Sequence, residues 1–358
     1  MNTQCPSLCL HFYRSSVKKK TAVLLVNLGS PDSPKPKDVY RYLTEFLNDP
    51  RVIDISWIGR KLLVNGIIVP FRHRNSAKLY QDLWTENGSP LIHYGKLVQQ
   101  LLQERFDNTI EADVKVFLGM RYQNPSLESA LTAVRKWNPD KILIIPLFPH
   151  YASASTGSVI DKCMRIMRDM WAFPDVEFIS QFWDHPLFLK AFIENGKQFN
   201  LAEYDHVLFS YHGLPERQLD KLYDDNKCSN HSCETEMNEE NRFCYKATCY
   251  ATTRAIAAGL GLDESKYSVA FQSRLGKGWI TPFSDVVIEE LAKKGKKKIL
   301  VYSPAFIADC LETTIEIGEE YQGLFEKYGG EKVQLVPSLN DNPTWVSALE
   351  DMVRKRLA

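Results

Sequence analysis

The chain has 358 residues, and its 44 basic residues balance its 44 acidic ones. This neutral balance argues against a nucleic-acid-binding protein, which usually carries a basic excess. No stretch approaches the ~20 apolar residues that a membrane-spanning helix needs, and the length predicts about two globular domains.

Residues 1–20 are predicted to form a flexible N-terminal extension. Leu8, Leu10 and Phe12 precede the lysines at 18–20, which is not the order of charges in a secretory signal. An apolar and basic segment of this kind suits contact with a membrane surface. The eight cysteines are too sparse for a disulfide-stabilised secreted domain, so a reducing, cytoplasmic compartment is expected.

Short runs rich in β-branched residues, bounded by turn residues, recur along the whole chain. Their apolar character on consecutive positions is typical of strands that are buried on both faces. The predicted strands are Val23–Leu28, Val114–Leu118, Ile142–Phe148, Val176–Gln181, Val207–Tyr211, Ser268–Gln272, Ile299–Tyr302 and Val333–Val336. Helical periodicity lies between them, for example at Val39–Phe46, Leu127–Trp137, Ala251–Ala258 and Val286–Ala292. Alternation of this kind predicts an α/β fold with parallel sheets.

The eight predicted strands form two similar sets of four. "VLLVNLGSP" from Val23 matches "VLFSYHGLP" from Val207, and "VFLGMR" ending at Arg121 matches "AFQSR" ending at Arg274. "KILIIP" matches "KILVYSP", and "VEFISQFWDHP" matches "VQLVPSLNDNP", in the same order. We therefore predict two similar, doubly wound, Rossmann-like lobes, each with a four-stranded parallel sheet flanked by helices. Ligands of such sheets bind beyond the carboxyl ends of the strands.

The domain limits follow from this repeat. We place the first lobe at 21–185, the second lobe at 186–340 and a C-terminal helix at 341–358. A long insertion, 32–113, follows strand 1 of the first lobe. A cysteine-bearing insertion, 216–266, follows strand 1 of the second lobe, so both insertions are expected at the mouth of the cleft.

A histidine ends the first strand of the second lobe. His212 follows "VLFSY", whereas the matching position of the first lobe is the inert Leu28. A neutral imidazole accepts a proton near pH 7 or binds a divalent metal. Most histidines are hydrogen-bonded within the core and have no catalytic role. The position of His212 at a strand end beside the cleft favours a catalytic or metal-binding role instead.

A row of carboxylates forms the second group. Asp309, Glu312 and Glu316 are spaced three and four apart, which stacks them on one face of a helix. Like charges on adjacent turns disfavour a helix, and a divalent cation would compensate them. A solvated helix face is the alternative.

Four cysteines crowd into one segment with the spacing C-x4-C-x10-C-x4-C: Cys228, Cys233, Cys244 and Cys249. Structural zinc sites favour C-x2-C pairs, whereas a C-x4-C step occurs in [2Fe–2S] ferredoxins. The spacing favours a [2Fe–2S] cluster, with zinc or free thiols as alternatives.

Taken together, these motifs resemble the ferrochelatase family from about residue 21 to the end. The resemblance rests on "NLGSP", "VYRYLTEFLNDPRVID", "NGSPL", "SYHGLPER", "FQSRLGKGWITP" and "PAFIADCLETTIE", in the family's order. It implies an enzyme, a lyase, that inserts Fe2+ into protoporphyrin IX between two lobes. Another tetrapyrrole chelatase, acting on coproporphyrin or cobalt, and a non-catalytic two-lobed iron–sulfur protein are the alternatives.

The resemblance also implies roles for individual residues. His212 and Glu312 match the catalytic pair, and the substrate iron would meet these two residues and their acidic neighbours Asp309 and Glu316 along its path. The porphyrin-binding positions are Leu28, Ser30, Arg72, Tyr80, Arg121 and Trp279. Many relatives have Asp-His before the glutamate, whereas this chain has Asp309 and Cys310. Some relatives hold a [2Fe–2S] cluster in the internal cysteine segment.

The apolar stretch "WIGRKLLVNGIIVPF" at 57–71 lies in the first insertion. It is either a cleft lip that enters lipid or an amphipathic helix packed on its own lobe. A lip would give the enzyme peripheral contact with the inner face of a membrane.

Overall fold

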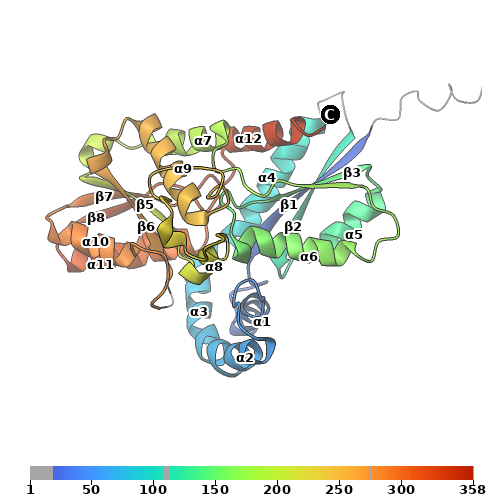
Figure 1. The fold of residues 1–358 in the computed structure, drawn as a ribbon, viewed down its shortest axis with the longest axis horizontal. Coiled ribbons are helices and arrows are strands. Elements are labelled where there is room, and N and C mark those ends of the chain that lie inside the picture. The colour runs from blue at the N-terminus through green and yellow to red at the C-terminus, as the bar shows by residue number, and fades with distance from the viewer. Residues whose placement is uncertain (1–18, 108–112, 275, 358) are drawn as a thin grey trace, which may run out of the picture.

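The computed structural model describes residues 19–107, 113–274 and 276–357. Most of the predicted N-terminal extension lies outside these residues, and Lys20 begins the first strand. The described strands form two four-stranded parallel sheets with the same order, β2-β1-β3-β4 and β6-β5-β7-β8 (Figure 1). The strands are β1 Lys20–Gly29, β2 Asp113–Tyr122, β3 Lys141–Pro146, β4 Asp175–Phe178, β5 His206–His212, β6 Tyr267–Gln272, β7 Lys298–Tyr302 and β8 Lys332–Leu335. The predicted fold is thus confirmed.

All eight predicted strands are present, with small shifts at their ends. β3 ends at Pro146 and β4 at Phe178, before the predicted ends at 148 and 181. β4 is an edge strand that pairs only with β3, so its ladder stops where that pairing stops. The central strands β1 and β5 are paired on both sides and match the prediction closely.

The strand register corrects one part of the predicted repeat. Asn27 pairs with Met120 and Gly29 with Tyr122, which places Arg121 beside Leu28. In the second lobe His212 pairs with Gln272. The structural counterpart of Arg121 is therefore Gln272, two residues before the predicted match.

The helices lie on the faces of the two sheets and in the insertions. They are α1 Pro36–Leu47, α2 Trp57–Lys61, α3 Val69–Leu83, α4 Pro90–Asp107, α5 Leu127–Trp137, α6 Ser158–Met167, α7 Pro186–Gly196, α8 Glu216–Asp220, α9 Tyr245–Leu260, α10 Ser284–Lys293, α11 Tyr321–Lys327 and α12 Pro343–Arg354. Within the described residues, three segments are π-helical: η1 Leu62–Ile68, η2 Ser153–Gly157 and η6 Leu311–Glu320. Short 3-10 turns are η3 Leu201–Glu203, η4 Cys228–Asn230 and η5 Glu264–Lys266. The four predicted helical segments fall within α1, α5, α9 and α10.

One core joins the two lobes. Buried residues of α4, α7, α9 and α12 form a single cluster with side chains from both sheets. The C-terminal helix α12 packs on α7 and on α4, and Arg105 of α4 pairs with Glu350 of α12 at 2.8 Å. The predicted C-terminal helix therefore packs against helices of both lobes and joins them.

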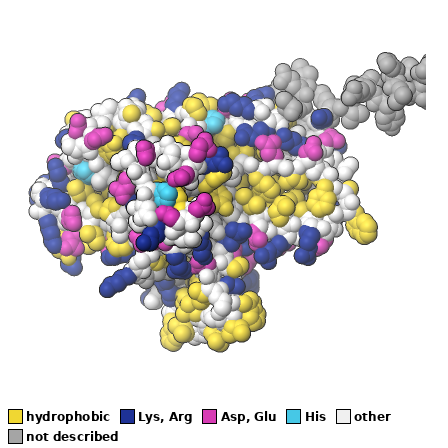
Figure 2. Space-filling view, viewed as in Figure 1, with side chains coloured by type: hydrophobic (Ala, Val, Ile, Leu, Met, Phe, Trp, Pro, Cys, Tyr) yellow, Lys and Arg dark blue, Asp and Glu magenta, His cyan; other side chains and the backbone are white. Residues whose placement is uncertain are grey.

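The first insertion forms an arm. Helices α1, α2 and α3 project from the body below the junction of the lobes (Figure 1). The tip of the arm is a dense apolar knob in Figure 2, and its exposed side chains include Leu62 at 69% and Phe71 at 77%. We call the exposed residues Ile55, Trp57, Ile58, Leu62, Ile67 and Phe71 the apolar lip.

Candidate active site between the lobes

His212 ends β5 at the carboxyl edge of the second sheet. Its ring nitrogen Nδ1 lies 2.6 Å from the carbonyl oxygen of Gly213. A carbonyl only accepts hydrogen bonds, so Nδ1 carries the proton and Nε2 of the neutral ring keeps its lone pair. The backbone therefore fixes a tautomer that presents Nε2 as a base or a metal ligand.

The turn after His212 requires a glycine. A side-chain carbon at Gly213 would lie 2.8 Å from the carbonyl oxygen of Gln272 and 3.2 Å from the Trp279 ring. The Gly213 amide itself donates to that same carbonyl at 2.8 Å. The absence of a side chain lets the turn lie against β6 and places Trp279 over it.

The carboxylates lie at the start of a π-helix, which differs from the predicted α-helix. η6 begins at Leu311, and Thr313 donates to the Cys310 carbonyl at its start. Glu312 and Glu316 are on this helix, but Asp309 precedes it and is bound by Asn340. π-helical turns are rare and concentrate at functional sites. The prediction that all three acids share one helical face is therefore wrong for Asp309.

One side chain connects the histidine with the acidic helix. Gln272, the register partner of His212, donates to the Glu312 carbonyl at 2.9 Å and to the Glu316 carboxylate at 3.2 Å. Phe306 lies 6.3 Å from the His212 ring, measured between centroids. The predicted catalytic pair thus lies at one edge of the second sheet.

Aromatic residues of the arm lie against the acidic helix η6. Tyr42 of α1 and Tyr80 of α3 meet edge to face, 6.1 Å apart. They share a core with Leu28 and with Ile315 of η6. Burial is the main reason that the pKa values of both tyrosines are raised, and the negative charge of Glu312 adds to the shift. Glu312 therefore faces the aromatic wall of the arm.

The other predicted porphyrin-binding residues differ in their exposure to solvent. Leu28 and Trp279 are half-buried, and Arg72 is exposed on α3. The hydroxyl of Ser30 is buried and has no hydrogen-bond partner within the described part of the chain. These positions surround the carboxyl ends of β1 and β5, where the sheet topology predicts a ligand.

Arg121 has a partner in its own lobe. Its guanidinium pairs with the buried carboxylate of Asp49, which also accepts from Tyr122 at 2.9 Å. Ser158 accepts from Arg121 at 2.6 Å. The side chain of Arg121 is 10% exposed and that of Asp49 only 2%. The structure thus gives Arg121 a buried structural pair, not a free charge for a porphyrin carboxylate.

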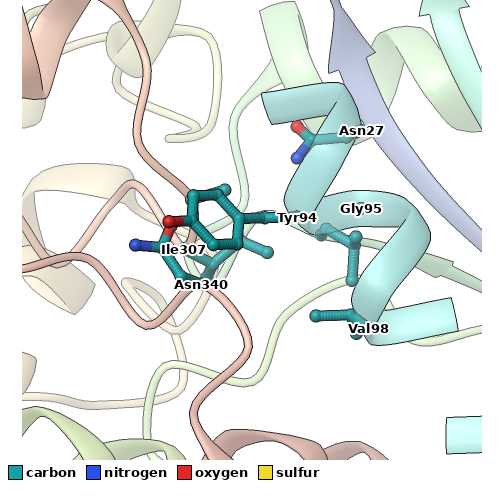
Figure 3. Close-up of a pocket in the computed structure, with 8 residues that line it drawn as sticks. Asn27, Tyr94, Gly95, Val98, Ile307 and Asn340 are labelled. Carbon is teal, nitrogen blue, oxygen red and sulfur yellow. The ribbon is translucent and has the colours of Figure 1, made fainter. Parts of the chain in front are cut away.

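A small cavity lies between the lobes behind this site. Its lining includes Asn27, Tyr94 and Asn340, and it leaves essentially no room for a water-sized molecule. Figure 3 shows Tyr94 reaching from α4 toward Ile307 and Asn340 of the second lobe. Ligand pockets usually measure roughly 300–1,000 Å³, so this cavity is too small for a macrocycle.

Three of the four clustered cysteines converge. Cys228, Cys233 and Cys244 are buried, and their sulfurs lie within 4.8 Å of one another. Tyr223 contacts the Cys233 sulfur at 3.0 Å. Hydrogen bonds from the other two thiols lower the pKa of Cys244, so it is the natural thiolate of the group. Cys249 is buried in α9 but lies outside this group.

Sequence reasoning missed several residues of the site. Tyr42, Gln272 and Asp49 carry contacts that no motif assigned. Gln272 stands in the quoted "AFQSR" motif, so the repeat itself pointed to that strand end. The partner of Asp49 is 72 residues away in sequence, and no local signal could have found it.

The chain has two matching lobes of parallel sheet, and the second carries His212 and the acidic helix at the carboxyl ends of its strands. A solved structure described as "SirB from Bacillus subtilis with Fe3+" shares the fold, with a TM-score of 0.51 and 15% identity, covering 95% of this chain and 96% of that one. The family model described as ferrochelatase matches residues 20–357. The chain belongs to the ferrochelatase family.

Named relatives agree over nearly the whole length. A ferrochelatase of Coxiella burnetii (strain Dugway 5J108-111) is 42% identical over 346 residues, covering 94% of each chain. One of Legionella pneumophila (strain Paris) is 41% identical over 339 residues, covering 94% of this chain and 100% of the relative.

Proposed function

We propose that His212 and Glu312 carry the proton transfers by which this ferrochelatase family member inserts Fe2+ into protoporphyrin IX. Membership of the family makes the chain an enzyme, a lyase, of haem synthesis. The observation that carries the assignment is the Nδ1 contact of His212 with the Gly213 carbonyl. It leaves Nε2 as an acceptor at the carboxyl edge of the sheet.

The reaction exchanges two protons for one divalent ion. Neutral porphyrin loses both pyrrole N–H protons, Fe2+ binds the four nitrogens, and the product is neutral again. A flat ring holds its nitrogen lone pairs in the plane, so a site that favours a bent ring lowers the barrier. His212 Nε2 takes a proton, and the Glu312 carboxylate accepts or relays one and stabilises the imidazolium. General acid–base help of this kind contributes about 10²–10⁴-fold.

We place the macrocycle between the arm and the end of β5. Tyr80 and Leu28 would contact one region of the ring and Trp279 another, since flat apolar ligands pack against aromatic planes. Arg72 is exposed on α3, and its guanidinium would pair with a propionate of the porphyrin. The buried, unpartnered hydroxyl of Ser30 supports a polar contact near β1.

The test is chelation by variants of the pair. We expect His212→Ala and Glu312→Gln to lose at least about 10²-fold in kcat while melting like the parent. The assay follows the Soret band with Fe2+ under anaerobic conditions, and with Zn2+ as a stable second metal. Near-normal turnover by His212→Ala would remove the imidazole from the mechanism. Parallel assays with coproporphyrin and Co2+ test the alternative chelatase activities.

We also propose that the cysteine segment holds a [2Fe–2S] cluster. Three converging buried thiols, one poised as a thiolate, fit a thiolate-bound metal group. Cys228, Cys233 and Cys244 would hold it, and Cys249 is the predicted fourth ligand although its sulfur lies outside the trio. Such a cluster would brace the long insertion or respond to redox state.

Metal analysis of the isolated protein tests the cluster. We expect iron and acid-labile sulfide with a red-brown colour, lost in Cys244→Ser and kept in the control Cys163→Ser on α6. Zinc in place of iron would favour the alternative site. A colourless, metal-free and active protein would refute both, and an unchanged spectrum of Cys249→Ser would exclude that residue as a ligand.

We further propose that the apolar lip contacts a lipid surface, as a peripheral enzyme on the cytoplasmic side would. None of the described helices is long and apolar enough to cross a membrane. The lip is a large exposed apolar patch at the end of the arm. Fully burying one such side chain contributes roughly 1.5–3 kcal/mol.

Vesicle flotation tests the lip. We expect Leu62→Ser, Ile67→Ser and Phe71→Ser together to weaken binding to phosphatidylcholine–phosphatidylglycerol vesicles at least about tenfold, since the loss exceeds 1.4 kcal/mol. Trp171 and Phe173 form an exposed apolar patch elsewhere, and the pair Trp171→Ser and Phe173→Ser is the control. Equal binding by the parent and the lip variant would refute the proposal.

A further inference from the structure

A buried polar network lies beneath His212. The amide of Gln272, 1% exposed, accepts from Ser210 at 2.7 Å and donates to the Glu312 carbonyl at 2.9 Å. Its second donation goes to Glu316 at 3.2 Å. Ser210 lies two residues before His212 on β5, and Gln272 is the register partner of His212 on β6. One amide thus connects the strand that carries the histidine with the helix that carries the glutamates.

Glu316 is fully engaged in this network. One oxygen accepts from the Ser273 amide and the Tyr321 hydroxyl, both at 3.0 Å. The other accepts from the Ser273 hydroxyl at 2.6 Å and from Gln272. A carboxylate has about four lone-pair positions, and all are used. A free iron ligand would instead keep lone pairs directed into the cleft.

Ser284, at the start of α10, extends the network. Its hydroxyl lies 2.9 Å from that of Ser210 and donates to it, because Ser210 donates its own proton to Gln272. The contacts therefore run from Ser284 through Ser210 and Gln272 to Glu316, which also accepts from Tyr321. Ser210 and Ser284 are completely buried. Satisfied buried networks fix a single arrangement, and removing one member leaves the others unpaired.

We propose that Gln272 and Glu316 are positioning residues that hold the π-helix, and with it Glu312, at a fixed place beside His212. Glu316 then serves the iron path only indirectly, in contrast to the role its spacing suggested. The inference rests on the proposed roles of His212 and Glu312. A displacement near 1 Å at a reacting group can cost about 10²-fold in rate, so loss of the network is expected to lower kcat.

The experiment compares Gln272→Glu, Glu316→Gln and the double variant that exchanges the two side chains. Gln272→Glu places two carboxylates face to face, whereas the exchange restores an amide–carboxylate pair. Glu319→Gln, an exposed acid on the same helix, is the control. Each protein is assayed for kcat and for KM of Fe2+ and Zn2+ with protoporphyrin, and for Tm.

We expect each single variant to lose about tenfold or more in kcat and to melt lower, with the KM of both metals within about twofold of the parent. The exchange restores the contact between positions 272 and 316 but not the amide donation to the Glu312 carbonyl, so the double variant should recover part of the Tm loss and little of the kcat loss. The result that overturns the inference is a raised metal KM in Glu316→Gln with unchanged Tm, because that is the behaviour of an iron ligand. Normal turnover in His212→Ala and Glu312→Gln would instead defeat the proposed function, and the Tm and recovery measurements would still decide on the network.

Discussion

The pair of Asp49 and Arg121 gives a quantitative prediction about how the arm is held. Asp49 lies two residues after the last turn of α1 and joins the arm to β2 through Arg121 and Tyr122 and to α6 through Ser158. Both charges are nearly enclosed. Removing one partner of a buried ion pair costs about 3–5 kcal/mol, because the remaining charge stays buried and uncompensated.

We therefore expect Asp49→Ala to lower the free energy of unfolding by about 3–5 kcal/mol. A shift of about 2 °C for each kcal/mol in a large domain gives a Tm loss of at least about 6 °C. Asp161→Ala removes an exposed i,i+4 pair with Arg165 on α6 and is the control, expected to cost about 0.5 kcal/mol or less. Differential scanning calorimetry with urea titration measures both.

The pH dependence gives an independent check. Burial alone would raise the pKa of Asp49, but hydrogen bonds from Ser158 and from the Arg51 amide, with the Arg121 charge, outweigh it and lower the pKa. A lowered folded-state pKa contributes stability above the unfolded value of about 3.9 and loses it below. The parent and Asp49→Ala should therefore differ by a constant amount from pH 5 to 7 and converge below about pH 4. A Tm loss equal to that of Asp161→Ala, or no convergence in acid, would refute the structural role of this pair.

Three further predictions concern single positions. Gly213→Val should lower kcat at least about tenfold, because the new side chain would press on the Gln272 carbonyl. The control Gly323→Ala has open space around it and should have the kcat of the parent. Equal kcat values for the two variants would contradict the close contact at Gly213. Asp54→Ala should raise hydrogen exchange in α8, because Asp54 joins the arm to Arg217 of that helix and to Lys221 directly after it. Burial would raise the pKa of Asp54, but hydrogen bonds from these two side chains outweigh that effect and lower the pKa to about 2. Unchanged exchange would mean that the link is dispensable. His150 is buried, and burial lowers its pKa to about 3. The unfolded chain therefore binds a proton that the folded chain does not, and stability should fall as pH drops below about 6.5. His206, whose pKa is lowered to about 4 mainly by burial, acts in the same window, so His150→Phe should reduce the slope in calorimetry between pH 4 and 6.5 and leave the share of His206; an unchanged slope would assign it to other groups.

The sequence was sufficient for the sheets because their signals are local. Four apolar runs and their near-copies identified all eight strands, and the order of the copies implied equal topology. The strand ends that carry Gly29 and Gly213 were found for the same reason, since a turn and its glycine are adjacent in sequence. His212 was found because its counterpart, Leu28, has no polar group.

The features of the site that the sequence did not predict depend on contacts between segments that are distant in sequence. A spacing of three and four predicts one helical face for Asp309, Glu312 and Glu316, yet Asp309 is held by Asn340, which is 31 residues away. Arg121 seemed available to a porphyrin until Asp49 was seen to neutralise it. The facing of Tyr42 and Tyr80 depends on how α1 and α3 pack, and periodicity within either helix does not specify it.

The duplicated fold explains why a structural role for Glu316 is reasonable. Each lobe has a π-helical segment after its third strand, η2 after β3 and η6 after β7. In each lobe, the residue beside the end of the first strand reaches toward that segment: Arg121 contacts Ser158, directly after η2, and Gln272 contacts Glu316 in η6.

Both connections end on a carboxylate that accepts several hydrogen bonds, the buried Asp49 in the first lobe and the half-buried Glu316 in the second. The first lobe has Leu28 where the second has His212. Its network therefore holds the arm and the π-helical segment in place, but there is no imidazole beside it. If the two networks share an origin in the duplication, anchoring is the common property and the chemistry was added at His212 and Glu312. A Glu316→Gln variant with a raised metal KM and an unchanged Tm would break this parallel.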